Sequence, residues 1–257
     1  IRDRLYSMCI VSLLSLYAFS EGKRRKNMIK MFKNILKRRI TSNDFVNEIR
    51  NRGGIVGERV SFIDPSSTHY DFNYPYAIKI GNDVTITPKV TILAHDYSYS
   101  VLNKVYGIMP QNFRPTQIGN NIFIGEGATI LMGTTIGDNV IIGAGAVVSG
   151  NIPCNTVWAG NPARQICTLD EYKEKHLNRY EESAVLLAQQ IFDRFHRKPT
   201  YSEMKMFIGL FAPRTDEYKK YFKRLNSNLQ GVPENVWRVE QKYEDLEDFL
   251  KKNKIDF

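Results

Sequence analysis

A period of six residues runs through the middle of the chain, from about residue 55 to residue 163. Mostly β-branched or other apolar residues recur at every sixth position, and a second small or apolar residue follows most of them by four. The first set is Val56, Phe62, Thr68, Tyr74, Ile80, Ile86, Ile92, Ile118, Ile124, Ile130, Ile136, Ile142 and Val148. An α-helix repeats every 3.6 residues and a strand every 2, so neither explains this pattern. It predicts a solenoid in which each hexad forms one short strand and one corner.

Three hexads would close one triangular coil, and glycines after many of the apolar positions would supply the tight corners. Thirteen hexads predict a little over four coils, stacked at the ordinary strand spacing of about 4.8 Å. The pattern is weakest at Thr68 and Tyr74, so we expect the first coil to be irregular.

The period breaks once. Ile92 and Ile118 are one hexad and a further 20 residues apart, which places an excursion at about residues 98–117. A loop of this length in a compact repeat usually has a function. It begins just after His95-Asp96 and is rich in aromatic residues, so we expect the binding site for a substrate here.

The flanks read as helical. Residues 1–54 form a basic arm, with an amphipathic helix over 27–39 and a short helix that starts near Thr41 and ends at Gly53-Gly54. Residues 55–168 form the repeat domain. Residues 169–257 predict helices over 170–197, 202–211, 215–225 and 234–252. Packing or oligomerisation is the expected role of this last region, and binding of the acceptor or a partner is the alternative.

Charge and cysteine content narrow the class of protein. The net charge of +9 lies entirely in residues 1–54, which hold 13 Lys and Arg against 4 Asp and Glu, so a nucleic-acid partner is not expected. The apolar run 8–19 is too short to span a membrane; it predicts a helix packed on its own or a neighbouring subunit, with a signal peptide as the alternative. Residues 23–39 could instead rest on an anionic membrane surface. Three cysteines make no disulfide framework, which favours a cytoplasmic location, at the inner face of the membrane if the arm binds there.

Residues 78–166 resemble the hexapeptide-repeat acetyltransferases, a family that includes maltose, galactoside, serine and capsular-polysaccharide O-acetyltransferases and xenobiotic acetyltransferases. The matching stretches are IGNDVTI at 80–86, VTILAHD at 90–96, IGNNIFIG at 118–125, IGDNVIIGAGA at 136–146, NIP at 151–153 and AGNPA at 159–163. The resemblance implies a mainly β protein, a left-handed parallel β-helix with helical appendages. It also implies acetyl-CoA as donor and a homotrimer with sites between subunits.

By this resemblance His95 occupies the position of the catalytic histidine. A sugar hydroxyl is a poor nucleophile near neutral pH, and a neutral imidazole can take its proton as the oxygen attacks the thioester. The reaction would be direct transfer in a ternary complex, without an acyl-enzyme. The repeat domain has only one other histidine, His69, whereas carbonic-anhydrase-type metal catalysis needs three, so no metal is expected.

Coil stacking suggests a partner for His95: Asp71 or Asn73, one coil earlier, would hold the imidazole or bind the acceptor. Tyr97, at the start of the aromatic-rich excursion, would line the acceptor cleft, and the resemblance places Phe123 there too. The backbone N–H of Glu126 would stabilise the tetrahedral oxyanion.

The resemblance places the donor on Ala144, Ser149 and Arg164. Backbone groups of Ala144 would bind the pantetheine amides, and Arg164 would meet a phosphate. The chain departs from the family at Gly150, where a lysine is common after the serine, so this phosphate contact lacks a charge.

The leading hypothesis is an acetyl-CoA-dependent O-acetyltransferase acting on a saccharide hydroxyl, such as that of a capsule or lipopolysaccharide precursor. One alternative is acetylation of a drug or small amine. Two others are a non-catalytic β-helix scaffold and a membrane-surface adaptor built on the basic arm.

Overall fold

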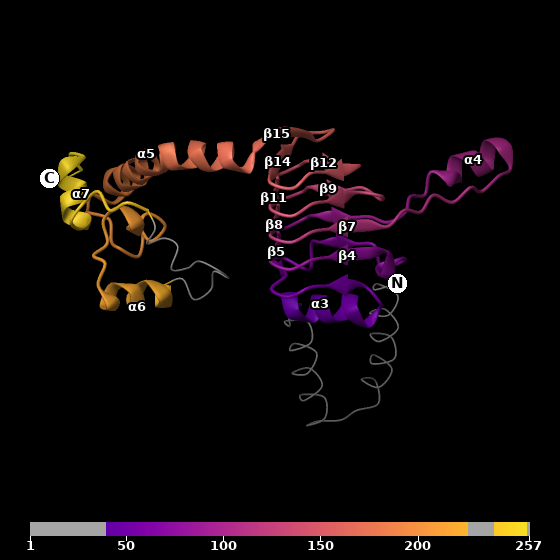
Figure 1. Ribbon diagram of the computed structural model, residues 1–257, viewed down its shortest axis with the longest axis horizontal. Helices are drawn as coiled ribbons and strands as arrows, with labels where there is room; N and C mark the ends of the chain where they lie inside the picture. Colours follow the sequence, from indigo (N-terminus) through magenta and orange to yellow (C-terminus); the bar gives the residue numbers. More distant parts are fainter. Residues whose placement is uncertain (1–39, 226–238, 256–257) are drawn as a thin grey trace, which may run out of the picture.

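A stack of short strands forms the body of the protein. The computed structural model describes residues 40–225 and 239–255, without the side chains of 221–225. Fourteen strands are parallel to their neighbours within three sheets, and the chain visits the sheets in a fixed order. This is a left-handed parallel β-helix, mainly β with helices at both ends, as expected (Figure 1). The apolar run 8–19, the amphipathic segment 27–39 and the proposed membrane contact 23–39 lie outside the described residues.

The three sheets are named here by their order in the chain. Sheet A comprises β1 (Ile55–Val56), β4 (Ile78–Ile80), β7 (Thr116–Ile118), β10 (Thr135–Ile136) and β13 (Asn151–Ile152). Sheet B comprises β2 (Ser61–Phe62), β5 (Val84–Ile86), β8 (Ile122–Ile124), β11 (Val140–Ile142), β14 (Thr156–Ala159) and the antiparallel β15 (Arg164–Thr168). Sheet C comprises β3 (His69–Tyr70), β6 (Thr91–Ile92), β9 (Thr129–Ile130) and β12 (Val147–Val148). Four complete coils and part of a fifth result, which confirms the predicted number.

Register between coils confirms the hexad count and the position of the excursion. Gln117 pairs with Thr135, 18 residues on, which is three hexads. Lys79 pairs with Gln117, 38 residues on, which is one regular coil plus the predicted 20-residue excursion.

Isoleucine side chains fill the interior in layers. Ile86, Ile124 and Ile142 stack on sheet B and are fully buried. Branched side chains suit a two- or three-residue strand that buries every second position. The glycines that follow these isoleucines let successive coils pack closely against each other. A Cβ on Gly119 would lie 2.8 Å from the backbone of Gly137 in the next coil, too close for any side chain.

The first coil departs from the repeat. Sequence phase placed Thr68 and Tyr74 in the core, but Tyr70 takes the inward position in β3 and pairs with Ile92, while Thr68 and Tyr74 are only partly buried. The irregular coil is therefore confirmed and its phase is corrected. The cause is local, since the turn over residues 64–68, held by hydrogen bonds to Asp64, shifts the following strand by two residues.

A ladder of side chains follows the corner between sheets A and B. Asn82 accepts a hydrogen bond from the Glu58 backbone N–H at 2.8 Å, Asn120 from Asn82 at 2.9 Å, and Asp138 from Asn120 at 2.7 Å. Cys154 ends the ladder with a sulfur acceptor at 3.2 Å from the Asp138 backbone nitrogen. Each rung satisfies one backbone donor that the corner would otherwise expose.

We expect Cys154→Asn to stabilise the β-helix, because an amide oxygen is a stronger acceptor than a thiol sulfur. A gain of about 0.5–1.5 kcal/mol per improved hydrogen bond corresponds to a rise of roughly 1–5 °C in the unfolding midpoint. Circular dichroism on heating measures it, with Cys154→Ala as the matched control that removes the acceptor and lowers the midpoint. A midpoint for Cys154→Asn at or below that of Cys154→Ala would contradict the role given to this rung.

Helix α3 (Ser42–Asn51) covers the open end of the core at the first coil. Its N-cap is Thr41, whose side chain accepts a hydrogen bond from the Asp44 N–H while the Asp44 carboxylate accepts one from the Thr41 N–H. Phe45 and Ile49 are buried against the β-helix. The predicted short helix and cap are confirmed.

The excursion forms an arm that projects from the β-helix and carries helix α4 (Tyr99–Tyr106) at its far end (Figure 1). No α4 side chain is buried. At its base, the outgoing and returning chains pair antiparallel, His95 opposite Phe113, and the Arg114 N–H donates to the Ala94 carbonyl at 3.0 Å.

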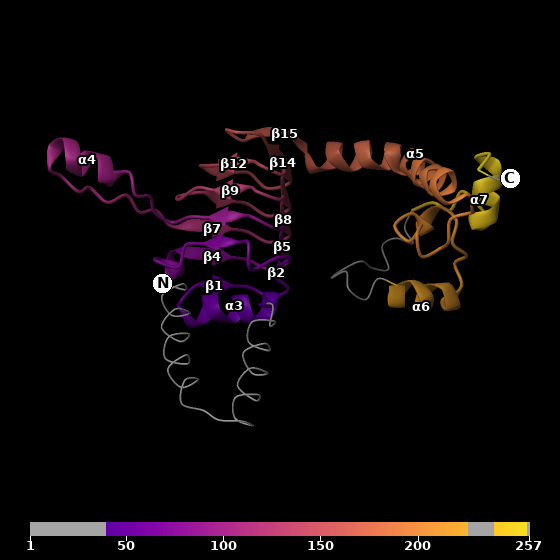
Figure 2. The same cartoon turned by 180° about the vertical axis from the view of Figure 1, so that it is seen from behind.

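The C-terminal region begins with α5 (Leu169–Phe195), which starts at a Thr168 capping box beside β15 and leads away from the β-helix (Figure 2). Its second half packs with 3₁₀ helix η2 (Ile208–Leu210) and α7 (Leu246–Lys252) around a separate core that includes Ala188, Phe211 and Phe249. Helix α6 (Asp216–Leu225) follows η2. No helix within the described ranges is long and apolar enough to cross a membrane.

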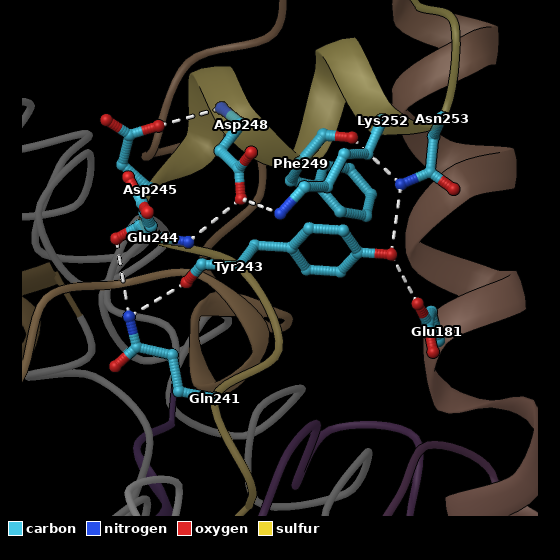
Figure 3. Close-up of polar contacts among 9 residues, drawn as sticks. All are labelled: Glu181, Gln241, Tyr243, Glu244, Asp245, Asp248, Phe249, Lys252 and Asn253. Atoms are coloured by element: carbon cyan, nitrogen blue, oxygen red, sulfur yellow. Dashed lines mark hydrogen bonds and ion pairs between the residues drawn. The ribbon is translucent and has the colours of Figure 1, made fainter.

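Polar contacts fix α7 against α5 (Figure 3). The Tyr243 hydroxyl donates to Glu181 of α5 and accepts from Asn253 at 3.2 Å, and Lys242 also pairs with Glu181. Together with the apolar core, this network gives the region a defined packing.

Two helix predictions in this region are wrong. Residues 202–211 form turns ending in η2, because Ile208, Leu210 and Phe211 are all buried and a regular helix would turn some of this run to solvent. The predicted helix 234–252 begins only at Leu246, capped by Asp245, and the described residues before it are extended or bent.

Candidate active site

His95 and Asp71 meet at the edge where sheet C leads into sheet A. Asp71 directly follows β3, and His95 lies three residues after β6 in the next coil, so coil stacking brings the two side chains together. The His95 Nδ1 atom makes a short hydrogen bond to Asp71 Oδ2. Asp71 is 2% exposed and also accepts from the Ala94 N–H at 2.9 Å and the Asn73 N–H at 3.2 Å.

This arrangement leaves the other imidazole nitrogen available. When the proton of this hydrogen bond is on Nδ1, the Asp71 carboxylate accepts it together with the two backbone N–H groups. A neutral imidazole then carries a lone pair on Nε2. His95 Nε2 is buried, and no polar atom of the described residues bonds to it. A buried polar atom without a partner needs explanation, and a hydroxyl group of a bound substrate would satisfy it.

Two tyrosine rings contact the imidazole. The Tyr97 ring lies 4.7 Å from the His95 ring and the Tyr74 ring 4.9 Å, both edge-on. Asn73 Nδ2 donates to the Tyr97 hydroxyl at 2.9 Å. The four residues 71, 73, 95 and 97 that the sequence singled out at this edge therefore lie together. Tyr74 was missed as a site residue because its hexad position assigned it to the core.

Asp96, adjacent to His95, makes its hydrogen bonds to residues of the arm and not to the imidazole. Its carboxylate accepts from the Ser98 hydroxyl at 2.6 Å and from Asn112 Nδ2 at 2.9 Å. The hydrogen bonds from the Ser98 side chain and backbone, with that from Asn112, lower the pKa of Asp96 below its usual value. This ionised carboxylate joins the two sides of the arm's base, which orients the loop that follows His95.

The remaining predicted site residues do not contact His95 in one copy of the chain. Ser149 and Gly150 form the turn between β12 and β13, on the same edge as His95. Glu126 and Ala144 lie on the edge between sheets B and C, and Phe123 points outward from the middle of β8, 43% exposed. Arg164, exposed, starts β15.

The edge between sheets B and C offers open backbone. Gly127 and Gly145 have φ of +70° and +67°, and nothing lies within 4 Å of where their Cβ atoms would be. Among the described residues none accepts a hydrogen bond from the Glu126 N–H, while the Glu126 side chain pairs with Lys89. The Glu126 N–H can therefore donate to a carbonyl oxygen of a ligand laid along the edge, whereas the N–H groups of Gly127 and Gly145 already donate to the carbonyls of Pro88 and Glu126. In one copy of the chain they are separated from His95 by sheet C.

Comparison with known proteins agrees with this architecture. Residues 115–150 match the family described as bacterial transferase hexapeptide (six repeats). Protein CapG of Staphylococcus aureus is 36% identical over 181 residues, which cover 70% of this chain and 94% of CapG. The chain belongs to the hexapeptide-repeat transferase family. It is an acyltransferase.

Two further relatives carry names that specify an activity. Galactoside O-acetyltransferase of Escherichia coli K12 is 41% identical over 101 residues, 39% of this chain and 48% of that protein. The chain thus spans about half of that relative but nearly all of CapG. A solved galactoside acetyltransferase in complex with coenzyme A has 27% identity and a TM-score of 0.38, covering 63% of this chain and 80% of that one.

Proposed function

We propose that the protein transfers the acetyl group of acetyl-CoA to a saccharide hydroxyl, with His95 as general base. The observation that carries this proposal is the buried, unpartnered Nε2 of an imidazole whose Nδ1 is held by Asp71. The O-acetyltransferase name of a relative that is 41% identical over the repeat supports the choice of an acetyl donor and a sugar acceptor. Tyr74 and Tyr97, beside the imidazole, provide apolar faces of the kind on which sugar rings pack.

The chemistry follows from these groups. His95 Nε2 accepts the proton of the acceptor hydroxyl as its oxygen bonds to the thioester carbonyl carbon, and Asp71 stabilises the imidazolium that forms. The negative charge on the carbonyl oxygen is met by backbone N–H groups such as that of Glu126. When the tetrahedral intermediate collapses, the carbon–sulfur bond breaks and the proton passes from Nε2 to the departing thiolate. The products are an acetyl ester and free CoA, and no acyl-enzyme forms.

A homotrimer is part of the proposal. The base lies on the edge between sheets C and A, whereas Glu126 and Ala144 lie on the edge between sheets B and C. Neighbouring copies can bring one edge of each type together, so that the donor lies along Ala144 of one copy and reaches His95 of the next. Arg164, exposed near the end of the stack, would meet the phosphates there. The reducing environment that suits three cysteines makes a cytoplasmic location part of the same proposal.

The test is release of free thiol from acetyl-CoA in the presence of a panel of mono- and oligosaccharides. The proposal expects release that depends on one class of sugar and an acetyl ester on that sugar by mass spectrometry. Small amines and amino-sugar antibiotics in the same panel test the alternative of xenobiotic or amine acetylation. Release with amines alone would replace the saccharide acceptor, and no release with any acceptor would favour a scaffold without catalysis.

A further inference from the structure

Four rings lie in contact one after another: Phe113 on the arm, Tyr74, the His95 imidazole and Tyr97. The Phe113 ring lies 5.1 Å from Tyr74, Tyr74 lies 4.9 Å from His95, and His95 lies 4.7 Å from Tyr97. Ring centroids at these separations are in direct contact. Phe113 belongs to the returning side of the arm, and Tyr74 belongs to the irregular first coil.

The imidazole needs more than its hydrogen bond to be oriented. The bond from Nδ1 to Asp71 fixes one atom of the ring, but the plane can still turn about that atom and move Nε2. The Tyr74 and Tyr97 rings contact the imidazole at interplanar angles of 65° and 77°, and side chains packed this closely restrict its rotation. The two rings are unequal, because Tyr97 is 59% exposed whereas Tyr74 is partly buried and packs on the core of the β-helix. Tyr74 is therefore the firmer side.

The backbone also anchors Tyr74. Its N–H donates to the Asp71 carbonyl at 3.3 Å, and its own carbonyl accepts from Ala77 at 3.0 Å at the start of the 3₁₀ helix η1 (Pro75–Ala77). Its ring also contacts Phe113, which lies opposite His95 in the antiparallel bridge at the arm's base. The position of the arm and the plane of the imidazole thus share one set of ring contacts.

We propose that Tyr74 is a positioning residue for His95 and that Phe113 couples it to the arm, so that the direction of Nε2 depends on the ring contacts at the base of the arm. The effect on catalysis rests on the proposed function, in which His95 is the general base. The effect on the orientation of the imidazole is independent of that function. A misdirected base loses rate without losing substrate affinity, since a displacement of about 1 Å can cost on the order of 100-fold.

Tyr74→Leu, Tyr74→Phe and Phe113→Leu test the proposal, with Tyr76→Leu as the matched control. Tyr76 is an exposed aromatic two residues away whose ring lies 6.3 Å from Tyr74, on the surface, and is not paired with His95, so this control shows the effect of losing an outer neighbour of Tyr74 alone. Two quantities are measured in the intact chain: thiol release from acetyl-CoA with the acceptor found in the saccharide screen, and exchange of the His95 Nδ1–H with water by ¹⁵N-histidine NMR. His95→Ala identifies the resonance among the four histidines.

The expected result for Tyr74→Leu is kcat lower by about 10- to 100-fold, an unchanged KM for acetyl-CoA, and Nδ1–H exchange faster by roughly tenfold. Phe113→Leu shifts both quantities the same way by less, and Tyr74→Phe and Tyr76→Leu stay near the parent. If Tyr74→Leu only lowers the unfolding temperature and leaves exchange and kcat unchanged, the ring merely packs and the proposal is overturned. If exchange responds but His95→Ala retains transfer, the positioning stands and the proposed function fails.

Discussion

Replacing His95 with alanine is expected to lower acetyl transfer by about 10²–10⁴-fold, the usual contribution of a general base. The substitution removes the buried Nε2 that has no hydrogen-bond partner among the described residues and that the proposed function assigns to the acceptor hydroxyl. Affinity for acetyl-CoA should be unchanged, because the candidate donor groups lie on other turns of the stack. Thiol release at saturating acetyl-CoA measures the first quantity, and calorimetric titration of acetyl-CoA measures the second.

The matched control for this substitution is His69→Ala. His69 lies at the start of β3 with its side chain exposed, in the coil below His95, and takes no part in the candidate site. Its replacement should leave transfer within about twofold of the parent, since surface substitutions away from a site have small effects. Equal loss in both variants would mean that His95 acts through the stability of the coil and not as a base.

The second large effect is expected for Asp71→Asn. The asparagine oxygen cannot replace both carboxylate oxygens as acceptor, and its NH₂ group would face Nδ1 and favour the tautomer that carries the proton on Nε2. An imidazole in that tautomer cannot accept the hydroxyl proton, so kcat should fall by about 10- to 100-fold, as is typical when the partner of a functional histidine is lost. Asp71 is 2% exposed, so loss of charge-assisted bonds should also cost about 1.5–3 kcal/mol of stability.

Asp96→Asn separates tautomer control from general loss of negative charge. Asp96 is the neighbouring carboxylate in sequence, but it bonds to Ser98 and Asn112 and not to the imidazole. It should leave the ¹⁵N shifts of His95 in the Nδ1–H form, whereas Asp71→Asn should move them toward the other tautomer. Parent-like shifts and kcat in Asp71→Asn would contradict the role assigned to the pair.

The β-helix was predictable because its six-residue period recurs in every coil after the irregular first one. Ile118, Ile124 and Ile130 occupy equivalent buried positions in the three sheets of one coil, so one rule fixes register, coil number and the length of the excursion. The pairing of Asp71 with His95 was one of two options at that spacing. Stacking places both candidates near His95, since the coil from β3 to β6 spans 22 residues, and only the structure distinguished Asp71 from Asn73 as the partner.

Other features depend on contacts that no periodicity encodes. Tyr70 replaces Thr68 in the core because a hydrogen-bonded turn before it adds residues, which a strict hexad count cannot foresee. The segment 202–211 has helix-compatible residues, but its separate core buries them on all sides and favours turns. Tyr74 becomes part of the site only because the arm returns Phe113 to its far side.

Thermal unfolding of the parent chain with and without acetyl-CoA tests the central claim most directly, because it requires no knowledge of the acceptor. A ligand at about 100 times its dissociation constant stabilises the folded state by roughly 2.7 kcal/mol, which for a chain of this size is a rise of about 5–10 °C in the midpoint. We expect such a rise in the unfolding midpoint, retained in His95→Ala and reduced in Arg164→Ala. An unchanged midpoint at millimolar acetyl-CoA would contradict acetyl-CoA as the donor and would favour a longer acyl donor or a scaffold.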